Sequence, residues 1–381
     1  MQHLSLIHID NEQKTDPVVN LAVEEYALRY LDPQYDYLML TNNIPSVIMG
    51  RNQNPLEEID FRYLEKQGIR LIRRLSGGGT VYHDPGNLNF SFVTRYDPAR
   101  LHNFRFFNTP VVEVLRELGV PAYMNDRNDI LANGKKISGS AQFSSRGRMI
   151  SHGTLLFDAD LDHLENVLAA RPYGVASKSH KSVRSRVANI RSLLSRDMDM
   201  DQFRLYMLGG LLKRGLGGSL DDSKKTDDEQ QDRTSGKQAP AGVPGGSKLC
   251  LQASAWQQIR QIQEQRYESW EWNMGRTPRF EIRRSVSISG NKLHMTAQIQ
   301  KGIIAHIQFK ELSIESEPQT RNTATIRKMI RQLEQDLRQL EQDLTGAQYD
   351  YRMIGHLVQN YLRKSSLATD ISAEKLLGLL F

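Results

Sequence analysis

Three consecutive glycines flanked by charged residues form the stretch of this chain with the clearest chemical potential. Residues 73–87 read Arg-Arg-Leu-Ser-Gly-Gly-Gly-Thr-Val-Tyr-His-Asp-Pro-Gly-Asn. Fixing a glycine costs more backbone entropy than fixing any other residue, so such a run marks backbone that approaches another group closely or adopts positive φ. Exposed backbone amides beside Arg73 and Arg74 suit the oxygens of a phosphate. We therefore expect an anion cradle here, with a purely structural turn as the alternative.

Neither of two common nucleotide-binding patterns is present in this glycine run. It lacks the Gly-Lys-Ser/Thr ending of a P-loop, and it is not a Gly-x-Gly-x-x-Gly sequence that opens a helix. Strand-like residues lie on both sides, at 69–72 before the glycines and at 88–93 after them. The sequence therefore predicts a glycine turn between two strands.

A second polar cluster spans residues 125–141 and contains a Lys-Lys pair beside small residues. Asn133-Gly134 is a strong signal for a tight turn between two strands. Lys135 and Lys136 then enter a strand of small residues, where a substrate could lie close to the backbone. A lysine in that place can hold a carboxylate and a phosphate together as a fixed positive charge. A solvated lysine pair on a hairpin is the alternative.

The third cluster, residues 177–190, crowds Lys178, Lys181, Arg184 and Arg186 among several hydroxyl groups. It could close over an anionic ligand or dock an acidic partner, although a solvated loop face is the commoner explanation of such a run.

Two histidines, His83 and His152, lie elsewhere in the first half of the chain. Each alone is more typical of a hydrogen-bonded structural residue than of a catalyst or a metal ligand.

The composition limits the class of protein. A chain of 381 residues with 39% hydrophobic content can form two or three domains with proper cores. The net charge of +6 suits an acidic partner or substrate, but no arginine-rich tract with interleaved aromatics indicates nucleic acid. The single cysteine, Cys250, excludes a disulfide framework and a Cys-based zinc site, and we expect it to be inert.

We expect a cytoplasmic protein that does not enter a membrane. No run of about 18 apolar residues is present, which is the length that a membrane-spanning helix requires. The first residues fit neither a secretory signal nor an arginine-rich transit peptide. A lone cysteine is consistent with an intracellular compartment.

Three regions of different composition follow one another. Residues 1–216 alternate strand-like and helix-like patterns, which predicts an α+β or α/β domain with a central sheet. Residues 217–248 contain only Leu220 and Val243 as large apolar residues, so we expect a disordered linker or surface insertion, with a more ordered polar loop as the alternative. Residues 249–381 have the pattern of a second, smaller module.

Near the end of the chain the heptad Arg-Gln-Leu-Glu-Gln-Asp-Leu occurs twice in tandem, at 331–337 and 338–344. With Ile326 and Ile330, its leucines keep alternating four- and three-residue spacing. The pattern is typical of a coiled coil with another chain or of an amphipathic helix packed on its own sheet. About three heptads are short for a free coiled coil, so we favour the packed helix and expect a monomer.

In their order along the chain, the three clusters resemble motifs of the lipoate–protein ligases. The glycine run at 73–87 matches that family's signature. Further segments similar to family motifs lie at 50–55, 127–130, 136–141, 152–156, 182–187 and 270–273. The resemblance covers nearly the whole chain except 217–248, and the shared order makes it specific where one motif alone would be weak.

The resemblance implies an α+β protein with a biotin/lipoate ligase-like catalytic domain at 1–216, built from a mixed β-sheet and flanking helices. A small α+β accessory domain is implied at 249–381. The implied reaction has two steps: lipoate and ATP form lipoyl-AMP and pyrophosphate, and a lysine of a lipoyl domain then takes the lipoyl group and expels AMP. Mg2+ is implied beside the phosphates. The implied protein substrates are acidic lipoyl domains, those of E2 subunits and of the glycine cleavage H protein.

The family's site residues carry over by position. Lys136 is implied to contact both ATP and lipoate, and its ammonium could hold the attacking carboxylate and the α-phosphate together. ATP binding is implied for Arg74 and for the stretch Gly79, Thr80, Val81 and Tyr82. Further pocket or adenylate contacts are expected at Ser76, His83, Asn128, Asp129, Ser138, Gly139 and His152.

Three other functions compete with this one. An octanoyl- or lipoyltransferase of the same fold would lack the ATP step, but such relatives use a cysteine thioester and Cys250 lies outside the catalytic region. A biotin ligase fits less well, because Gly50-Arg51-Asn52-Gln53 is not that family's glycine-rich basic loop. A non-enzymatic lipoyl-domain or nucleotide-binding protein is the remaining alternative, and pyrophosphate release from ATP on adding lipoate would distinguish it.

Overall fold

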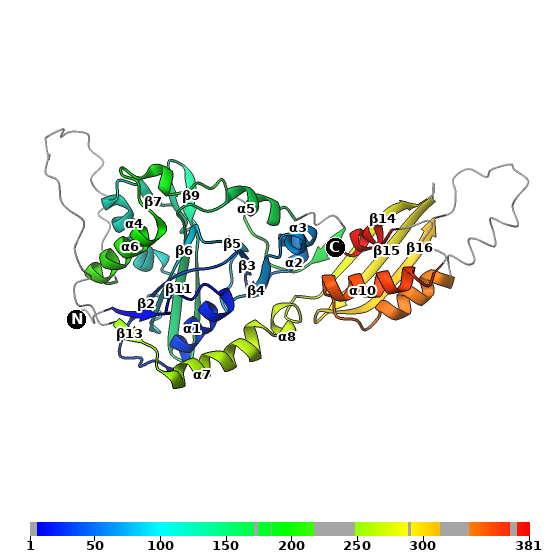
Figure 1. The fold of residues 1–381 in the computed structure, drawn as a ribbon, viewed down its shortest axis with the longest axis horizontal. Helices are drawn as coiled ribbons and strands as arrows, with labels where there is room; N and C mark the ends of the chain where they lie inside the picture. The colour runs from blue at the N-terminus through cyan, green and yellow to red at the C-terminus, as the bar shows by residue number, and fades with distance from the viewer. Residues whose placement is uncertain are drawn as a thin grey trace, which may run out of the picture.

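The computed structural model describes residues 6–170, 174–183, 185–216, 248–288, 291–312, 335–365 and 372–381. Its helices and strands form a larger and a smaller body, which follow one another along the long axis of the molecule (Figure 1). Of the linker predicted at 217–248, only Lys248 lies among the described residues. No helix in the described parts of the chain is both long and apolar enough to cross a membrane.

A mixed six-stranded sheet is the framework of the larger body. Its strands lie in the order β10 (Ser140–Ser145), β11 (Arg148–Leu156), β6 (Asn87–Arg95), β2 (Tyr37–Asn42), β1 (Ile7–Asp10) and β13 (Lys248–Cys250). The first four strands pair antiparallel, whereas β1 pairs parallel with both β2 and β13. This confirms the α+β class and the mixed sheet expected of the catalytic region.

Helices cover both faces of this sheet. They are α4 (Phe104–Glu117) and α6 (Met200–Arg214) on one face, and α1 (Pro17–Tyr30) and α7 (Ala253–Ile262) on the other. Successive strand residues point to opposite faces, so each strand supplies both cores. Leu38 of β2 packs with α4 and α6, while its neighbour Met39 packs with α1 and α7.

Two small sheets complete the larger body. One contains β4 (Arg70–Arg73), β3 (Ser46–Met49) and β5 (Val81–His83), and the other contains β7 (Ala122–Met124), β8 (Ile130–Ala132) and β9 (Lys135–Ser138). Asn133 and Gly134 join β8 to β9 with φ of 49° and 73°, which confirms the predicted tight turn. The glycine run joins β4 to β5. The strand predicted at 88–93 lies within β6, and the three-residue strand β5 lies between it and the glycine run.

The smaller body is a four-stranded sheet covered by helices. Its strands lie in the order β12 (Val175–Ser177), β14 (Phe280–Ile288), β15 (Asn291–Gln300) and β16 (Ile303–Leu312), and its helices are α10 (Tyr351–Leu362), α11 (Ala373–Leu380) and residues 335–344. The strand β12 lies directly before the third cluster, with which it shares Ser177, and it pairs antiparallel with β14.

The described half of the heptad segment packs within the smaller body. Leu337, Leu340 and Leu344 are buried in the same apolar cluster as the strands β14 to β16. This confirms, for residues 335–344, the prediction of an amphipathic helix packed on its own sheet. The preceding residues of the predicted helix lie outside the described parts of the chain.

Short helices lie where the two bodies meet. They are α2 (Pro55–Glu58), α3 (Phe61–Lys66) and α5 (Leu161–Val167). A 3-10 turn (Arg191–Leu193) packs instead against the core that contains α4 and α6. Leu56, Phe61 and Val167 share one apolar cluster with the smaller body's sheet. The bodies are therefore joined by packing as well as by the chain.

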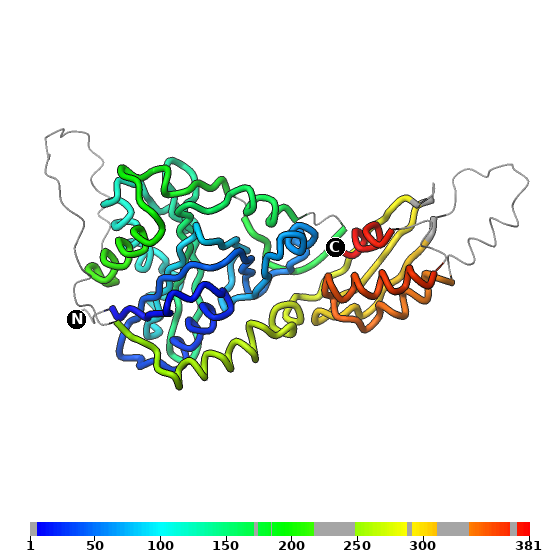
Figure 2. The backbone as a smooth tube through the Cα atoms, viewed as in Figure 1, coloured from blue at the N-terminus to red at the C-terminus, as the bar shows by residue number. Residues whose placement is uncertain are grey.

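The chain passes from the larger to the smaller body through α7, a π-helical turn (Gln263–Tyr267) and α8 (Trp270–Asn273) (Figure 2). The helix α7 packs against α1, and its Ile259 is fully buried there. Residues 248–262 therefore pack with the larger body, whereas the predicted division counted Lys248 with the linker and residues 249–262 with the accessory part. The division into domains stays a prediction.

Candidate active site

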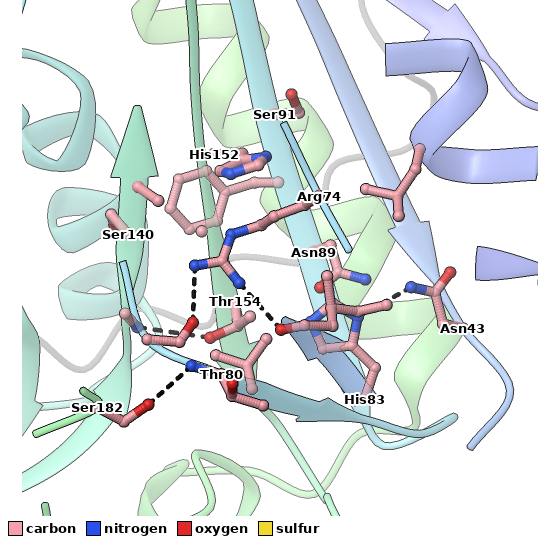
Figure 3. A pocket seen from close by; sticks show the side chains of 18 of the residues that line it. Asn43, Arg74, Thr80, His83, Asn89, Ser91, Ser140, His152, Thr154 and Ser182 are labelled. Atoms are coloured by element: carbon pink, nitrogen blue, oxygen red, sulfur yellow. Dashed lines mark hydrogen bonds between the residues drawn. The ribbon is translucent and has the colours of Figure 1, made fainter. Parts of the chain in front are cut away.

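A cavity of about 290 Å3 lies between the central sheet, α1 and the small sheet that carries the glycine run (Figure 3). All three clusters singled out in the sequence contribute to its wall: Gly79 and Thr80 from the first, Lys136 and Gly139 from the second, and Ser182 from the third. The fold therefore gathers residues that are far apart in the chain around one space.

This cavity has an exposed mouth and a buried end. Arg127 and Lys181 line the mouth and are exposed. Met39 and Thr41 of β2 and Phe90 of β6 line the opposite end and are buried. A ligand with an anionic head and a long tail would place its head near the mouth and its tail in the buried end.

Lys136 extends from β9 into the cavity wall, where its Nζ lies 2.7 Å from Oδ1 of Asp129. Its backbone N–H donates to the carbonyl of Arg186 at 2.8 Å, which fixes the strand from its other side. A Cβ built on Gly139 would lie 3.0 Å from the Lys136 Nζ, so a glycine leaves room for the ammonium. The site thus presents a held cation near its mouth.

Arg74 directs its guanidinium at protein groups around the glycine run. Its Nη2 donates to the carbonyls of Gly77 at 2.6 Å and Gly79 at 2.7 Å. Its Nη1 donates to the carbonyl of Ile48 at 3.0 Å, and its Nε donates to Ser76 Oγ at 2.9 Å. Burial lowers the pKa of Arg74 to about 10, which leaves it cationic at neutral pH. Arg74 therefore fixes the shape of the loop that an incoming anion would meet.

The segment 50–53 supports the glycine run by close contact. A Cβ at Gly50 would lie 2.1 Å from the carbonyl oxygen of Gly78, which itself has a φ of 83°. Gln53 joins the same two segments, because its Oε1 accepts from Gly50 N at 3.0 Å and from Thr80 Oγ1 at 2.8 Å. The glycine run is thus positioned by backbone contacts that only a glycine at 50 allows.

A line of hydrogen bonds leads from the glycine run to the buried end of the cavity. Ser76 Oγ lies 2.7 Å from His152 Nε2, and His152 Nδ1 lies 2.8 Å from Glu24 Oε1. Ser91 Oγ donates to the same Glu24 oxygen at 2.6 Å. Burial alone would raise the pKa of Glu24, but His152, Ser91 and Arg74 outweigh it and hold that pKa below its ordinary value. The ionised Glu24 therefore fixes the orientation of His152.

His83 lies on the other side of the buried end, on the same strand face as Val81. Its Nδ1 lies 2.9 Å from Nδ2 of Asn43 (Figure 3). Burial, with the nearby Arg74 and His152, lowers the pKa of His83 to about 3. The ring is therefore neutral throughout the physiological range.

The third cluster closes onto the glycine run through Ser182. Its Oγ accepts from Thr80 N at 2.9 Å and from Gln53 Nε2 at 3.0 Å, and it donates to Glu58. Burial raises the pKa of Glu58, although its bonds to Ser182 oppose the rise. Because Ser182 bonds to the glycine run, a solvated loop face does not describe this part of the third cluster. Arg184 lies outside the described residues.

Arg73 points away from the cavity, so its prediction as a second cation of the anion cradle was wrong. Its Nη1 donates to three carbonyls of the segment 50–53 at 2.8–3.2 Å. Its Nε and Nη2 donate to the carbonyl of Asn273 and to Thr277 Oγ1. Arg73 is the last residue of β4 and Arg74 follows it, and their guanidinium groups bond to different segments. Arg73 instead joins the motif at 50–53 to the segment that leads into the smaller body.

Most of the other predicted site residues meet at the cavity. Those that line it are Arg74, Gly79, Thr80, Val81, His83, Asp129, Lys136, Gly139 and His152. Ser76 reaches it through Arg74 and His152. Tyr82 packs in the apolar cluster shared with the smaller body, and Asn128 and Ser138 are not part of the cavity wall either. The ligand contacts assigned to all these residues stay predictions.

Several wall residues were not predicted from the sequence. Asn20 and Glu24 come from α1, and Thr41 and Asn89 come from β2 and β6. A signal for the first pair was present, since two polar residues at i and i+4 interrupt an apolar helix face. Thr41 and Asn89 gave no comparable signal, because isolated polar residues are ordinary in strands.

The described residues contain no group of three His, Cys, Asp or Glu side chains placed to hold a metal ion. Asp129 lines the cavity near the mouth, where its Oδ1 pairs with the Lys136 Nζ at 2.7 Å. Mg2+ commonly binds through one or two carboxylates together with substrate phosphates, and this donor set fits that mode.

Comparison with known proteins identifies the relatives of this fold and cavity. The model of the lipoyl protein ligase A/B catalytic domain matches residues 16–211. The lipoate-protein ligase LplJ of Bacillus subtilis is 41% identical over 299 residues, which are 78% of this chain and 82% of that protein.

Two solved structures are similar over 72% of this chain. One is a crystal structure of lipoate-protein ligase A bound with ATP, with 28% identity, a TM-score of 0.53 and 99% of that chain covered. The other comes from a study of a bipartite lipoate protein ligase and its E2 lipoyl domain from Thermoplasma acidophilum, with 27% identity, a TM-score of 0.53 and 97% of that chain covered.

Proposed function

Because this chain belongs to the lipoate–protein ligase family, we propose that it attaches lipoate to a lysine of a lipoyl domain in two ATP-dependent steps. In the first step a lipoate carboxylate oxygen bonds to the α-phosphorus of ATP, and the bond to the bridging oxygen breaks to release pyrophosphate. In the second, the acceptor amine attacks the acyl carbonyl, the carbon–oxygen bond to AMP breaks, and the amine loses a proton.

The observation that carries this proposal is the placement of Lys136 and the glycine run in one cavity wall. The carboxylate and the α-phosphate are both anionic, so their approach needs a cation between them and hydrogen-bond donors around the phosphate. Lys136 supplies the cation near the mouth, and Gly79, Thr80 and Val81 line the same cavity. Arg74 contributes by holding the carbonyls of Gly77 and Gly79, which turns the loop toward the ligand.

The buried end of the cavity suits the acyl chain. Leu21, Met39, Ile48 and Phe90 provide apolar contacts there. Mg2+ would accompany the nucleotide and neutralise phosphate charge, with Asp129 as the nearby protein carboxylate.

Acidic lipoyl domains are the proposed protein substrates, as in the E2 subunits of 2-oxoacid dehydrogenase complexes and the glycine cleavage H protein. The exposed cations Arg127, Lys135, Lys178, Lys181 and Arg186 belong to the segments around the mouth. Opposite charge on a lipoyl domain would speed its encounter with this rim. We further propose that the protein acts as a monomer in the cytoplasm.

A transferase that uses no ATP is the main alternative and is less well supported. Its thioester would need a thiol at the cavity, but Cys250 is exposed on β13 and is not among the residues that line the cavity.

The test is exchange of labelled pyrophosphate into ATP by the full chain with Mg2+. Exchange that requires lipoate supports adenylation. Modification of an apo lipoyl domain from a preformed acyl donor without ATP, together with no exchange, would support the transferase instead.

A further inference from the structure

A chain of asparagine side chains fixes which nitrogen of His83 carries a proton. Asn20 Nδ2 donates to the backbone carbonyls of Lys14 at 3.0 Å and Asn42 at 3.2 Å, which only accept, so the orientation of this amide is set. The same Nδ2 donates to Asn43 Oδ1 at 2.8 Å. Asn43 therefore turns its Nδ2 toward His83 and donates to Nδ1.

The neutral His83 ring must then carry its hydrogen on Nε2. A neutral imidazole has one donor and one acceptor nitrogen, and Nδ1 is the acceptor here. Nε2 is buried and has no hydrogen-bond partner among the described residues. A buried donor without an acceptor destabilises a site, so native proteins usually provide a partner for it. In Figure 3 the ring extends from Asn43 toward the residues grouped around Arg74.

The strand β5 places His83 in the wall of the same cavity as Thr80 and Val81. Thr80 of the glycine run bonds to Ser182 of the third cluster. Val81 and His83 follow Thr80 along the chain and also line the cavity. A strand rises about 3.3 Å per residue, so His83 lies roughly 10 Å farther along than Thr80. That distance is comparable to the length of a medium-chain acyl group.

We propose that His83 is a specificity residue whose Nε2–H donates to the sulfur-bearing end of the acyl substrate, so that the cavity selects lipoate over the saturated acid octanoate. This inference rests on the proposed function, whose acyl head lies at Lys136. Ring sulfur is a weak acceptor, whereas a saturated chain offers none and would leave the donor unpaired. Thr41 and Asn89 contribute polar side chains to the cavity wall near the same end.

Two variants separate this role from a structural one. His83→Phe keeps a ring of similar shape but removes both nitrogens. His83→Gln keeps an N–H near the position of Nε2. Dissociation constants for lipoate and octanoate are measured by calorimetry on the full chain, beside lipoate- and octanoate-dependent pyrophosphate exchange.

The wild-type protein should bind lipoate more tightly than octanoate. His83→Phe should reduce this ratio by about three- to tenfold, the effect expected of one hydrogen bond, with the change in KM rather than kcat. His83→Gln should restore most of the ratio. Equal loss of affinity for both acids in His83→Phe, or an unchanged ratio, would overturn the assignment.

A further probe needs no variant. The compound ω-hydroxyoctanoate carries an oxygen acceptor at its far end, so the wild-type protein should bind it more tightly than octanoate. Equal affinities would count against the donor role even if His83→Phe did not fold. Absence of lipoate-dependent exchange in the wild-type protein would contradict the proposed function, while the binding ratios would still test His83.

Discussion

The Lys136 ammonium lies 2.7 Å from the Asp129 carboxylate, at the point where the second polar cluster meets the cavity. The pair is partly exposed, with side-chain exposures of 27% and 18%. Asp129 thus holds the cation in place but leaves it open to a ligand. Gly79 and Thr80 of the glycine run lie in the same wall, so the lysine and this loop can contact one anion.

Lys136→Ala should reduce lipoyl-AMP formation by at least about a hundredfold, because the variant loses the charge that brings two anions together. The melting temperature should change little, since this side chain is not part of an apolar core. Lys135→Ala is the matched control, because Lys135 is the exposed neighbour on the same strand. Lipoyl-AMP is measured by chromatography after a single turnover. Normal formation in Lys136→Ala would remove the role assigned to this residue.

Gly50→Ala should distort the glycine run and weaken ATP binding. The added Cβ would lie 2.1 Å from the Gly78 carbonyl oxygen, which is too short for any contact, so one of the two segments must shift. Gly209→Ala is the control, because that glycine lies inside α6 with no atom within 4 Å of the added Cβ. The control should keep its activity and gain up to about 1 kcal/mol in free energy of unfolding. Equal KM values for ATP in the two variants would contradict the packing argument.

Arg73→Met should lower the free energy of unfolding by roughly 3 kcal/mol, because it leaves several buried carbonyls without a donor. Arg70→Met, on the same strand, is the control. The Arg70 pair with Asp16 is about 40% exposed on both sides, and exposed pairs contribute at most about 1 kcal/mol. Urea denaturation measures both variants. Similar losses in the two would show that the buried contacts of Arg73 with residues 50–53, 273 and 277 stabilise the protein no more than an exposed ion pair does.

The buried His83 should make stability depend on pH. Its pKa is lowered from 6.5 to about 3 in the folded protein. Between these values the unfolded chain binds a proton that the folded chain does not, so the free energy of unfolding falls as the pH falls below 6.5. One such proton contributes a slope of at most about 1.4 kcal/mol per pH unit.

His83→Gln lacks this proton uptake, so its unfolding free energy should decline less steeply between pH 6 and pH 4 than that of the wild-type protein. Urea denaturation across this range compares the two slopes. Parallel slopes would mean that His83 binds its proton equally well in both states.

Local signals in the sequence predicted local structure correctly. The Asn133-Gly134 turn depends on two residues that tolerate positive φ, and the structure has them there. Nine of the residues expected at the site through the family resemblance line the cavity. The short strand β5 was missed because its three residues carry no periodic pattern.

Pairings between distant segments could not be predicted from residue patterns. The strand β13 joins β1 across the predicted linker, and β12 leaves the larger body to pair with β14. Nothing in three-residue strands specifies a partner, which is set by the packing of the elements around them. The direction of the Arg73 side chain was missed for a related reason. The sequence does not show which side of the chain faces the cavity and which faces the segment that leads to the smaller body.

The most direct test of the account is mass spectrometry of an apo lipoyl domain incubated with the full chain, lipoate and Mg-ATP. Wild-type protein should add one lipoyl group to one lysine, and omission of ATP or the change Lys136→Ala should abolish the mass increase. A lipoyl domain that remains unmodified with wild-type protein, or that is modified equally without ATP, would contradict the central claim.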